Sequence, residues 1–150
     1  MTHRERWQEL LDGRAELGPA LEELWRWIPS FHYGSPMTRW ASEDVELSDG
    51  VVVHVGDAVL PEQAVANRDE AAFPHAWEID FHRVDPLPHL ALGFGEHLCM
   101  GLHLAKLQLE LTIGTLLRRF PTLDLAVPAD QISWPVHGFL RSPDAVPVTW

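Results

Sequence analysis

Hydrophobic side chains recur at helical spacing in three segments of this sequence. The segments are residues 3–11, 19–28 and 100–120, and each stops at an Asp–Gly pair or directly before a proline. The second segment also begins with a proline, which suits the first turn of a helix. The pattern therefore predicts two short helices near the start of the chain and one long helix in its last third.

The long segment, residues 100–120, is hydrophobic on more than one side. Leu102, Ala105, Leu109, Ile113 and Leu116 form one row, and Leu104, Leu107 and Leu111 form another. At about 100° per residue the two rows point in roughly opposite directions. A helix of this kind must be covered on most sides. Because the preceding residues form only short helices, a small sheet and loops, we expect that they cannot bury both rows.

Short β-prone runs lie between the second and third helical segments. Residues 39–47 and 51–55 flank a Ser–Asp–Gly turn, so we expect an antiparallel hairpin, followed by a further short strand over 58–60. The other expected elements are a short helix over 61–66, a loop over 70–90, and a terminal hairpin of 138–140 with 145–150. The pattern predicts a mainly helical α+β chain in which residues 1–150 form a single unit.

Composition and charge narrow the class of protein. The chain has 150 residues, of which 46% are hydrophobic, enough for one domain with a core. Its formal net charge of −11 disfavours nucleic acid or an anionic membrane as the main partner. No apolar run approaches the roughly 18 residues that span a bilayer, and the N-terminus does not read as a signal peptide. A single cysteine excludes an internal disulfide, so we expect a reducing, cytoplasmic setting.

The single cysteine, Cys99, follows a glycine-rich stretch and directly precedes the longest helical segment. A thiolate is a strong ligand for soft metals, and the amide dipoles at the start of a helix favour it. Glycines allow a flat cofactor to approach the backbone closely, and His97 can offer a ring N–H to an anion at the edge of such a cofactor. By itself, however, a lone cysteine is more often a small buried hydrophobe, and a glycine-rich turn is more often only a turn.

The complete pattern around the cysteine is more specific than its parts. It resembles the haem-binding signature of the cytochrome P-450 monooxygenases, F-G-x-G-x-H-x-C-x-G-x-x-L-A, in which Leu92 takes the place of the phenylalanine. The matching positions are Gly93, Gly95, His97, Cys99, Gly101, Leu104 and Ala105. Three other blocks, ELWR, RWASEDVEL and GFLRSPDAVPVTW, occur in the family's order. The resemblance implies the C-terminal portion of the cytochrome P-450 fold, with the N-terminal part of that fold absent.

The resemblance also implies roles for individual residues. Cys99 would be the axial thiolate ligand of the iron of haem b, and His97 and Arg39 would bind the haem propionates. From the sequence alone, Arg39 would be read only as a cation at a strand edge. Further cofactor contacts are implied for Leu92, Gly93, Phe94, Gly95, Gly101 and Ala105, with Gly101 keeping the backbone close to the sulfur. Phe139 and Leu140 would lie at a tip that touches substrate.

Glu23 and Arg26 stand three residues apart in the second helical segment. An isolated pair of this kind is usually a surface ion pair that contributes a few tenths of a kcal/mol. The resemblance instead implies a structural lock, the family's E-x-x-R pair. In the family a basic third partner usually completes this lock. At that place we align Glu78, with His75 and His82 nearby.

The resemblance implies insertion of one oxygen atom into a small organic substrate, with electrons supplied by a ferredoxin or a reductase. In that chemistry the cysteine thiolate donates electron density to the iron. The alternative hypothesis is a truncated or split gene product, a fragment without catalysis of its own that at most binds haem or serves a structural role. We expect no monooxygenase activity from the isolated chain. A small domain without haem is disfavoured, because four separate blocks match in order.

Overall fold

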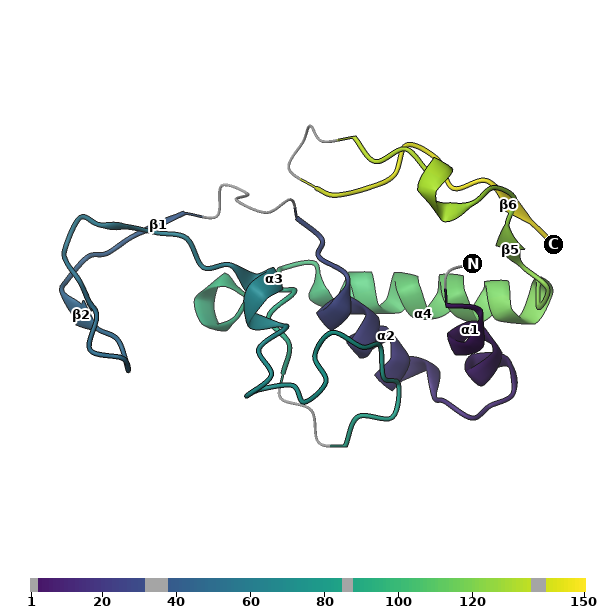
Figure 1. Cartoon of the computed structure of the whole chain (residues 1–150), viewed down its shortest axis with the longest axis horizontal. Helices are drawn as coiled ribbons and strands as arrows, with labels where there is room; N and C mark the ends of the chain where they lie inside the picture. The colour runs from purple at the N-terminus through teal and green to yellow at the C-terminus, as the bar shows by residue number, and fades with distance from the viewer. Residues whose placement is uncertain (1–2, 32–37, 85–87, 136–139) are drawn as a thin grey trace.

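The computed structural model describes residues 3–31, 38–84, 88–135 and 140–150. Its elements, in chain order, are the helices and strands α1 (Arg4–Leu11), α2 (Leu17–Trp27), β1 (Arg39–Trp40), β2 (Val45–Glu46), β3 (Val52–Val53), β4 (Ala58–Val59), α3 (Gln63–Ala66), α4 (Leu102–Arg119), β5 (Asp124–Leu125) and β6 (Val148–Thr149). Two short 3-10 turns, η1 (Gly95–His97) and η2 (Ala129–Gln131), flank α4. The four strands β1–β4 form an arm that extends away from the helices (Figure 1).

The three helices predicted from hydrophobic spacing are present. Helix α2 begins two residues earlier than expected, so Pro19 still lies in its first turn, where the missing N–H costs no helical hydrogen bond. Helix α2 packs against α4 (Figure 1). A Cβ at Gly114 of α4 would lie 3.4 Å from Leu17 Cδ2, so this glycine allows the two helices to approach closely.

A small core forms where α2 meets the loop that precedes α4. Ala15, Ala20, Ile79 and Phe81 are its buried members, and Leu10, Leu24 and Trp27 pack against it. None of the large side chains among the described residues is fully buried. The helices and the loop are therefore held together by a thin apolar layer, which gives the buried polar contacts described below more weight.

The two predicted rows of α4 differ in their burial. The residues of the first row are all half-buried. In the second row Leu104 is 60% exposed, Leu107 52% and Leu111 60%. This confirms the expectation that the preceding residues cannot cover both rows.

The strands pair partly as the sequence predicts. Strands β2 and β3 form the expected hairpin, with Val45 opposite Val53. Gly50 adopts a φ of +81° in the turn between them, a conformation that favours glycine. Strands β1 and β4 pair beyond them, with Arg39 opposite Val59. As expected, the described residues of the 70–90 segment form turns and irregular loop.

The predicted terminal hairpin of 138–140 with 145–150 is wrong. Residues 138 and 139 lie outside the described residues, and Leu140 forms an isolated antiparallel bridge with Phe31. The final strand, β6, pairs with β5 after α4. The Phe120 and Trp150 rings also meet, with centroids 5.4 Å apart. This distant partner was missed because local β-propensity does not determine which strand buries which side chain.

None of the helices in the described part of the chain combines the length and hydropathy that a membrane crossing requires.

We predict that the exposed row of α4 makes the isolated chain associate. Replacing Leu104, Leu107 and Leu111 together with glutamine should shift size-exclusion elution toward the monomer and leave the Tm nearly unchanged. The reason is that these side chains contribute little to folding, whereas covering their apolar surface by association yields about 25 cal/mol per Å².

The matched control is Leu109→Gln, in the half-buried row of α4. This change places an amide against apolar neighbours and should lower stability by about 1–3 kcal/mol. A wild-type chain that elutes as a monomer and melts cooperatively would contradict the prediction.

Candidate functional site

Backbone hydrogen bonds close the cysteine loop, which we define as residues 90–102. The N–H of Cys99 donates to the carbonyl of Leu92 at 2.8 Å, and the N–H of Gly93 donates to the carbonyl of Leu90 at 3.0 Å. On the other side, the N–H of Leu102 donates to the carbonyl of Cys99 at 3.1 Å, where α4 begins. The backbone of Cys99 is thus held from both directions, and its side chain is exposed.

Gly93 is the glycine of this loop that the chain itself requires. Its φ is +81°, and a Cβ at this position would lie 2.4 Å from the carbonyl oxygen of His97, so a larger residue would open the turn. At Gly101 a Cβ would lie 3.7 Å from Cys99 Sγ, an ordinary van der Waals contact. The described chain therefore leaves room for alanine there, and the role implied for Gly101 stays a prediction.

The loop borders a mainly apolar cavity of about 510 Å³. Arg39 and Leu140 reach the cavity from distant parts of the chain, and the cysteine loop contributes Leu92, Gly93, Phe94, His97 and Cys99. Three other predicted contacts, Gly95, Gly101 and Ala105, do not line it, and Phe139 lies outside the described residues. The structure thus brings most of the predicted cofactor residues to one cavity, whereas their roles stay predictions.

The polar groups at this cavity fit a flat ligand that carries anionic groups at its edge. A guanidinium from β1 and an imidazole from η1 can each donate to a carboxylate. Among the described residues, no three His, Cys, Asp or Glu side chains gather as a metal site. One thiol, Cys99, therefore suits a metal that arrives with its other donor atoms already in place, and haem is such a ligand.

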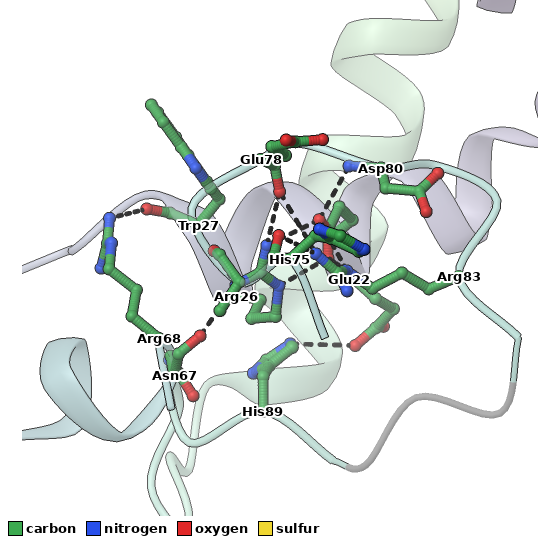
Figure 2. A network of polar contacts seen from close by, with 12 residues as sticks. Glu22, Arg26, Trp27, Asn67, Arg68, His75, Glu78, Asp80, Arg83 and His89 are labelled. Atoms are coloured by element: carbon green, nitrogen blue, oxygen red, sulfur yellow. Dashed lines mark hydrogen bonds and ion pairs between the residues drawn. The ribbon is translucent and has the colours of Figure 1, made fainter. Parts of the chain in front are cut away.

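The Glu23–Arg26 pair is buried, and its hydrogen bonding is complete. Arg26 is 2% exposed, and its Nε and Nη2 donate to the two carboxylate oxygens of Glu23, each at 2.7 Å. Its other N–H groups reach backbone carbonyls of Asn67, Ala76 and Glu78, at 2.8 to 2.9 Å (Figure 2). All five guanidinium donors are therefore used, which sets this pair apart from a surface ion pair.

The third partner of the lock is Arg83, so our alignment of Glu78 with that position is wrong. Arg83 Nε donates to both Glu23 oxygens, at 3.0 and 3.1 Å. The side chain of Glu78 is exposed, and Glu78 joins the network only through its backbone. The third partner comes from the irregular loop that follows α3. Which residue of that loop reaches Glu23 depends on how the loop folds and not on spacing in the sequence. Neither His75 nor His82 takes the place: His75 joins through its carbonyl oxygen, which accepts from Arg83 Nη2.

The carboxylate of Glu23 stays ionised despite its burial. Burial disfavours the charge, but hydrogen bonds from Arg26, from the Asp80 N–H and from Arg83 outweigh this effect and hold the pKa of Glu23 below its usual range. The network is therefore charged at neutral pH.

Asn67 is a site residue that the sequence analysis missed. It is 2% exposed and lies at the C-terminal end of α3. Its carbonyl oxygen accepts from Arg26, and its side-chain Oδ1 accepts the Leu90 N–H at 2.7 Å. It thus connects the lock to the start of the cysteine loop. An asparagine after a helix usually reads as a cap, so the sequence gives no signal for this role.

A cysteine loop that leads into a long helix, an apolar cavity that Arg39 also lines and a buried Glu–Arg–Arg lock together fit the haem-thiolate class of proteins. The family model described as cytochrome P-450 matches residues 17–148. The chain belongs to the cytochrome P-450 family.

Similar bacterial proteins place the chain within that family. Over 97% of this chain, it is 44% identical to nocardicin C N-oxygenase of Nocardia uniformis. Over the whole of this chain, it is 43% identical to biflaviolin synthase of Streptomyces coelicolor. The fold matches the crystal structure of LnmA, a cytochrome P-450 hydroxylase of the leinamycin pathway of Streptomyces atroolivaceus. That match has a TM-score of 0.91 and 43% identity, and it covers 99% of this chain and 38% of the other. The chain spans 36% of the length of these two curated relatives.

We predict that the lock makes the free energy of unfolding fall at acid pH. Because folding lowers the pKa of Glu23, its contribution is present above the ordinary glutamate pKa and is lost as the pH falls through the folded value. Glu23→Gln should destabilise the chain at neutral pH by about 3–5 kcal/mol, since it leaves the two arginines uncompensated.

The variant should also show a weaker loss of stability in acid than the wild type. Urea unfolding across a range of pH values measures both effects. Glu110→Gln, at an exposed position of α4, is the matched control. Equal unfolding curves for the Glu23 and Glu110 variants would show that the lock contributes nothing.

Proposed function

We propose that this chain is the haem-binding C-terminal portion of a cytochrome P-450 monooxygenase, and that residues 1–150 act as one partial domain. The whole enzyme would insert one oxygen atom into a small organic substrate. The observation that carries the proposal is the exposed Cys99 side chain at a cavity that Arg39 and His97 also line, on a backbone held by the hydrogen bond from the Cys99 N–H to the Leu92 carbonyl. When bound, haem b supplies the redox-active iron on which oxygen chemistry depends.

In this proposal Cys99 is the protein ligand of the iron. Its thiolate presents a soft, electron-rich donor, and the backbone bond to Leu92 fixes the direction in which the side chain leaves the loop. The required turn at Gly93 keeps the loop closed. The loop would thus be preorganised before the cofactor arrives.

Arg39 and His97 would hold the propionates from two sides. Arg39 belongs to β1 and His97 to η1, so two N–H donors come to the cavity from separate elements. Each would form a charge-assisted hydrogen bond to a carboxylate. Leu92, Phe94 and Leu140 would supply apolar wall around the ring, while Gly95, Gly101 and Ala105 keep the cofactor-binding roles that the motif implies.

The substrate and the electron donor are proposed at the level of class. The names of these relatives describe reactions on small organic molecules, such as nocardicin C, and a molecule of that kind is proposed for this chain. Phe139 and Leu140 would contact it, and a ferredoxin or reductase would deliver electrons.

A second candidate is a chain that binds haem, or only supports structure, without catalysis of its own. The exposed leucine row on α4 favours this for residues 1–150 in isolation. The two candidates share the same haem site and differ in whether substrate is turned over.

Reduced, carbon monoxide-treated haem complexes of the wild type and of Cys99→Ala test the ligand. The wild type should give the thiolate type of Soret band, and Cys99→Ala should not, because the chain has no other thiol. His103→Ala removes an exposed imidazole of α4 and should leave the band unchanged. A thiolate-type band that survives Cys99→Ala would overturn the assignment.

Haem retention tests the roles of Arg39 and His97. Arg39→Leu and His97→Leu should each weaken haem binding, by about 1.5–3 kcal/mol where the contact is shielded and by less where water reaches it. Transfer of haem to an excess of apomyoglobin measures the effect as a rate. Arg14→Leu, an exposed cation paired with Asp12, is the matched control. Equal transfer rates for all three variants would show that Arg39 and His97 are ordinary surface cations.

A further inference from the structure

One carboxylate outside the lock contacts residues on both sides of the cysteine loop. Glu22 of α2 accepts from His89 Nε2 at 3.1 Å and pairs with Lys106 Nζ at 2.5 Å. His89 directly precedes the loop, and Lys106 lies early in α4, which follows it. Figure 2 shows the His89 ring directed at Glu22.

The second ring nitrogen of His89 fixes its protonation state. The backbone N–H of Ala91 donates to His89 Nδ1 at 3.3 Å, so this nitrogen must carry the lone pair. Nε2 then carries the proton that reaches Glu22, and the ring is neutral. The ring is 11% exposed and lies edge-on to Trp25, so it has little freedom to turn.

Ala91 stands inside a short run of residues that are each held by a hydrogen bond. The Leu90 N–H donates to Asn67, the Ala91 N–H donates to His89, and the Leu92 carbonyl accepts from the Cys99 N–H. The bond at Ala91 therefore lies one residue from the contact that fixes Cys99. His89 does not itself line the cysteine cavity, but a change at His89 can reach Cys99 through this backbone, which does.

We propose that His89 is a positioning residue for the sulfur ligand. Its neutral ring accepts the Ala91 N–H and so fixes the backbone at Ala91, which in turn keeps the neighbouring Leu92 carbonyl in place to accept the Cys99 N–H. Protonation of His89 at Nδ1 replaces the lone pair with an N–H that faces the Ala91 N–H. The hydrogen bond is then lost, and residues 90–92 are released. The inference rests on the proposed function, in which Cys99 is the iron ligand.

The charged groups around His89 are consistent with this. Burial lowers the pKa of the His89 imidazole, Glu22 opposes the effect, and Lys106 adds to it. His89 lines a second cavity, of about 530 Å³, which is separate from the cysteine cavity. The charged residues Glu22, Glu23, Arg26, Asp80 and Arg83 border it too. Because the folded pKa is lower than the unfolded one, the stabilisation is present above the ordinary histidine pKa and is lost as the pH falls through the folded value.

Two variants separate the hydrogen bond from the charge. In His89→Asn the side-chain oxygen can accept the Ala91 N–H two residues on, as asparagine does in turns, but the group does not titrate. In His89→Phe the ring shape is kept and the acceptor is lost. Lys106→Met removes a charge that faces Glu22 and leaves both ring nitrogens in place.

Amide hydrogen exchange of the full chain, read by fragmentation mass spectrometry and corrected for intrinsic rates, tests the proposal without haem. As the pH falls from neutral to well below the ordinary histidine pKa, through the lowered folded pKa of His89, wild type should lose about tenfold or more of its protection at Ala91 and Cys99. His89→Asn should keep the protection at both pH values, and His89→Phe should lack it at both. Lys106→Met should lose protection as wild type does. The Asp80 amide, bound to Glu23, is the internal reference.

Wild-type protection at Cys99 that does not change with pH would overturn the proposal, and so would a His89→Asn variant that keeps the wild-type pH dependence. If His89→Phe fails to fold, the pH profiles of the wild type and of His89→Asn still decide whether the proposal holds. The thiolate-type Soret fraction of the haem-loaded chain should follow the same pH profile. A thiolate-type band that survives Cys99→Ala would instead refute the proposed function and leave the amide result standing, so the two failures are distinguishable.

Discussion

The structure depends on one buried carboxylate that is satisfied on every side. Taking the charges of Glu23 and Arg26 out of water costs several kcal/mol for each ion, and only complete hydrogen bonding offsets this. Here the remaining Arg26 donors end on backbone carbonyls of Asn67, Ala76 and Glu78. An irregular loop with a thin apolar core is therefore held in one conformation, because any rearrangement would leave buried donors unpaired.

The same network determines where the cysteine loop begins. Asn67 passes the constraint from Arg26 to Leu90, and the cysteine loop closes through the Leu92–Cys99 hydrogen bond. A chain of single, directional contacts thus links a lock on one helix to a thiol at a cavity. This arrangement suits a site that must present one donor atom in a fixed direction, and it explains why the network consists of hydrogen bonds and not of apolar contacts.

Regular spacing in the sequence predicted the helices, the β2–β3 hairpin and the exposed row of α4, because periodicity and turn chemistry are local properties. The spaced motif likewise placed Cys99 and His97 on one loop. Arg83 and Asn67 were missed, since their partners depend on how an irregular loop folds back. The partner of β6 was also missed, because strand pairing over a long separation depends on what each strand buries. Contacts between distant segments were predicted only where a family motif related them, as for Arg39 and Cys99, and were missed elsewhere.

The central claim is that Cys99 donates its sulfur to iron in the haem-loaded chain. X-ray absorption at the iron edge measures this directly, because a sulfur neighbour scatters differently from nitrogen or oxygen. The account predicts one sulfur neighbour in addition to the porphyrin nitrogens, and its loss in Cys99→Ala. An iron surrounded only by nitrogen and oxygen in the wild-type chain would contradict it.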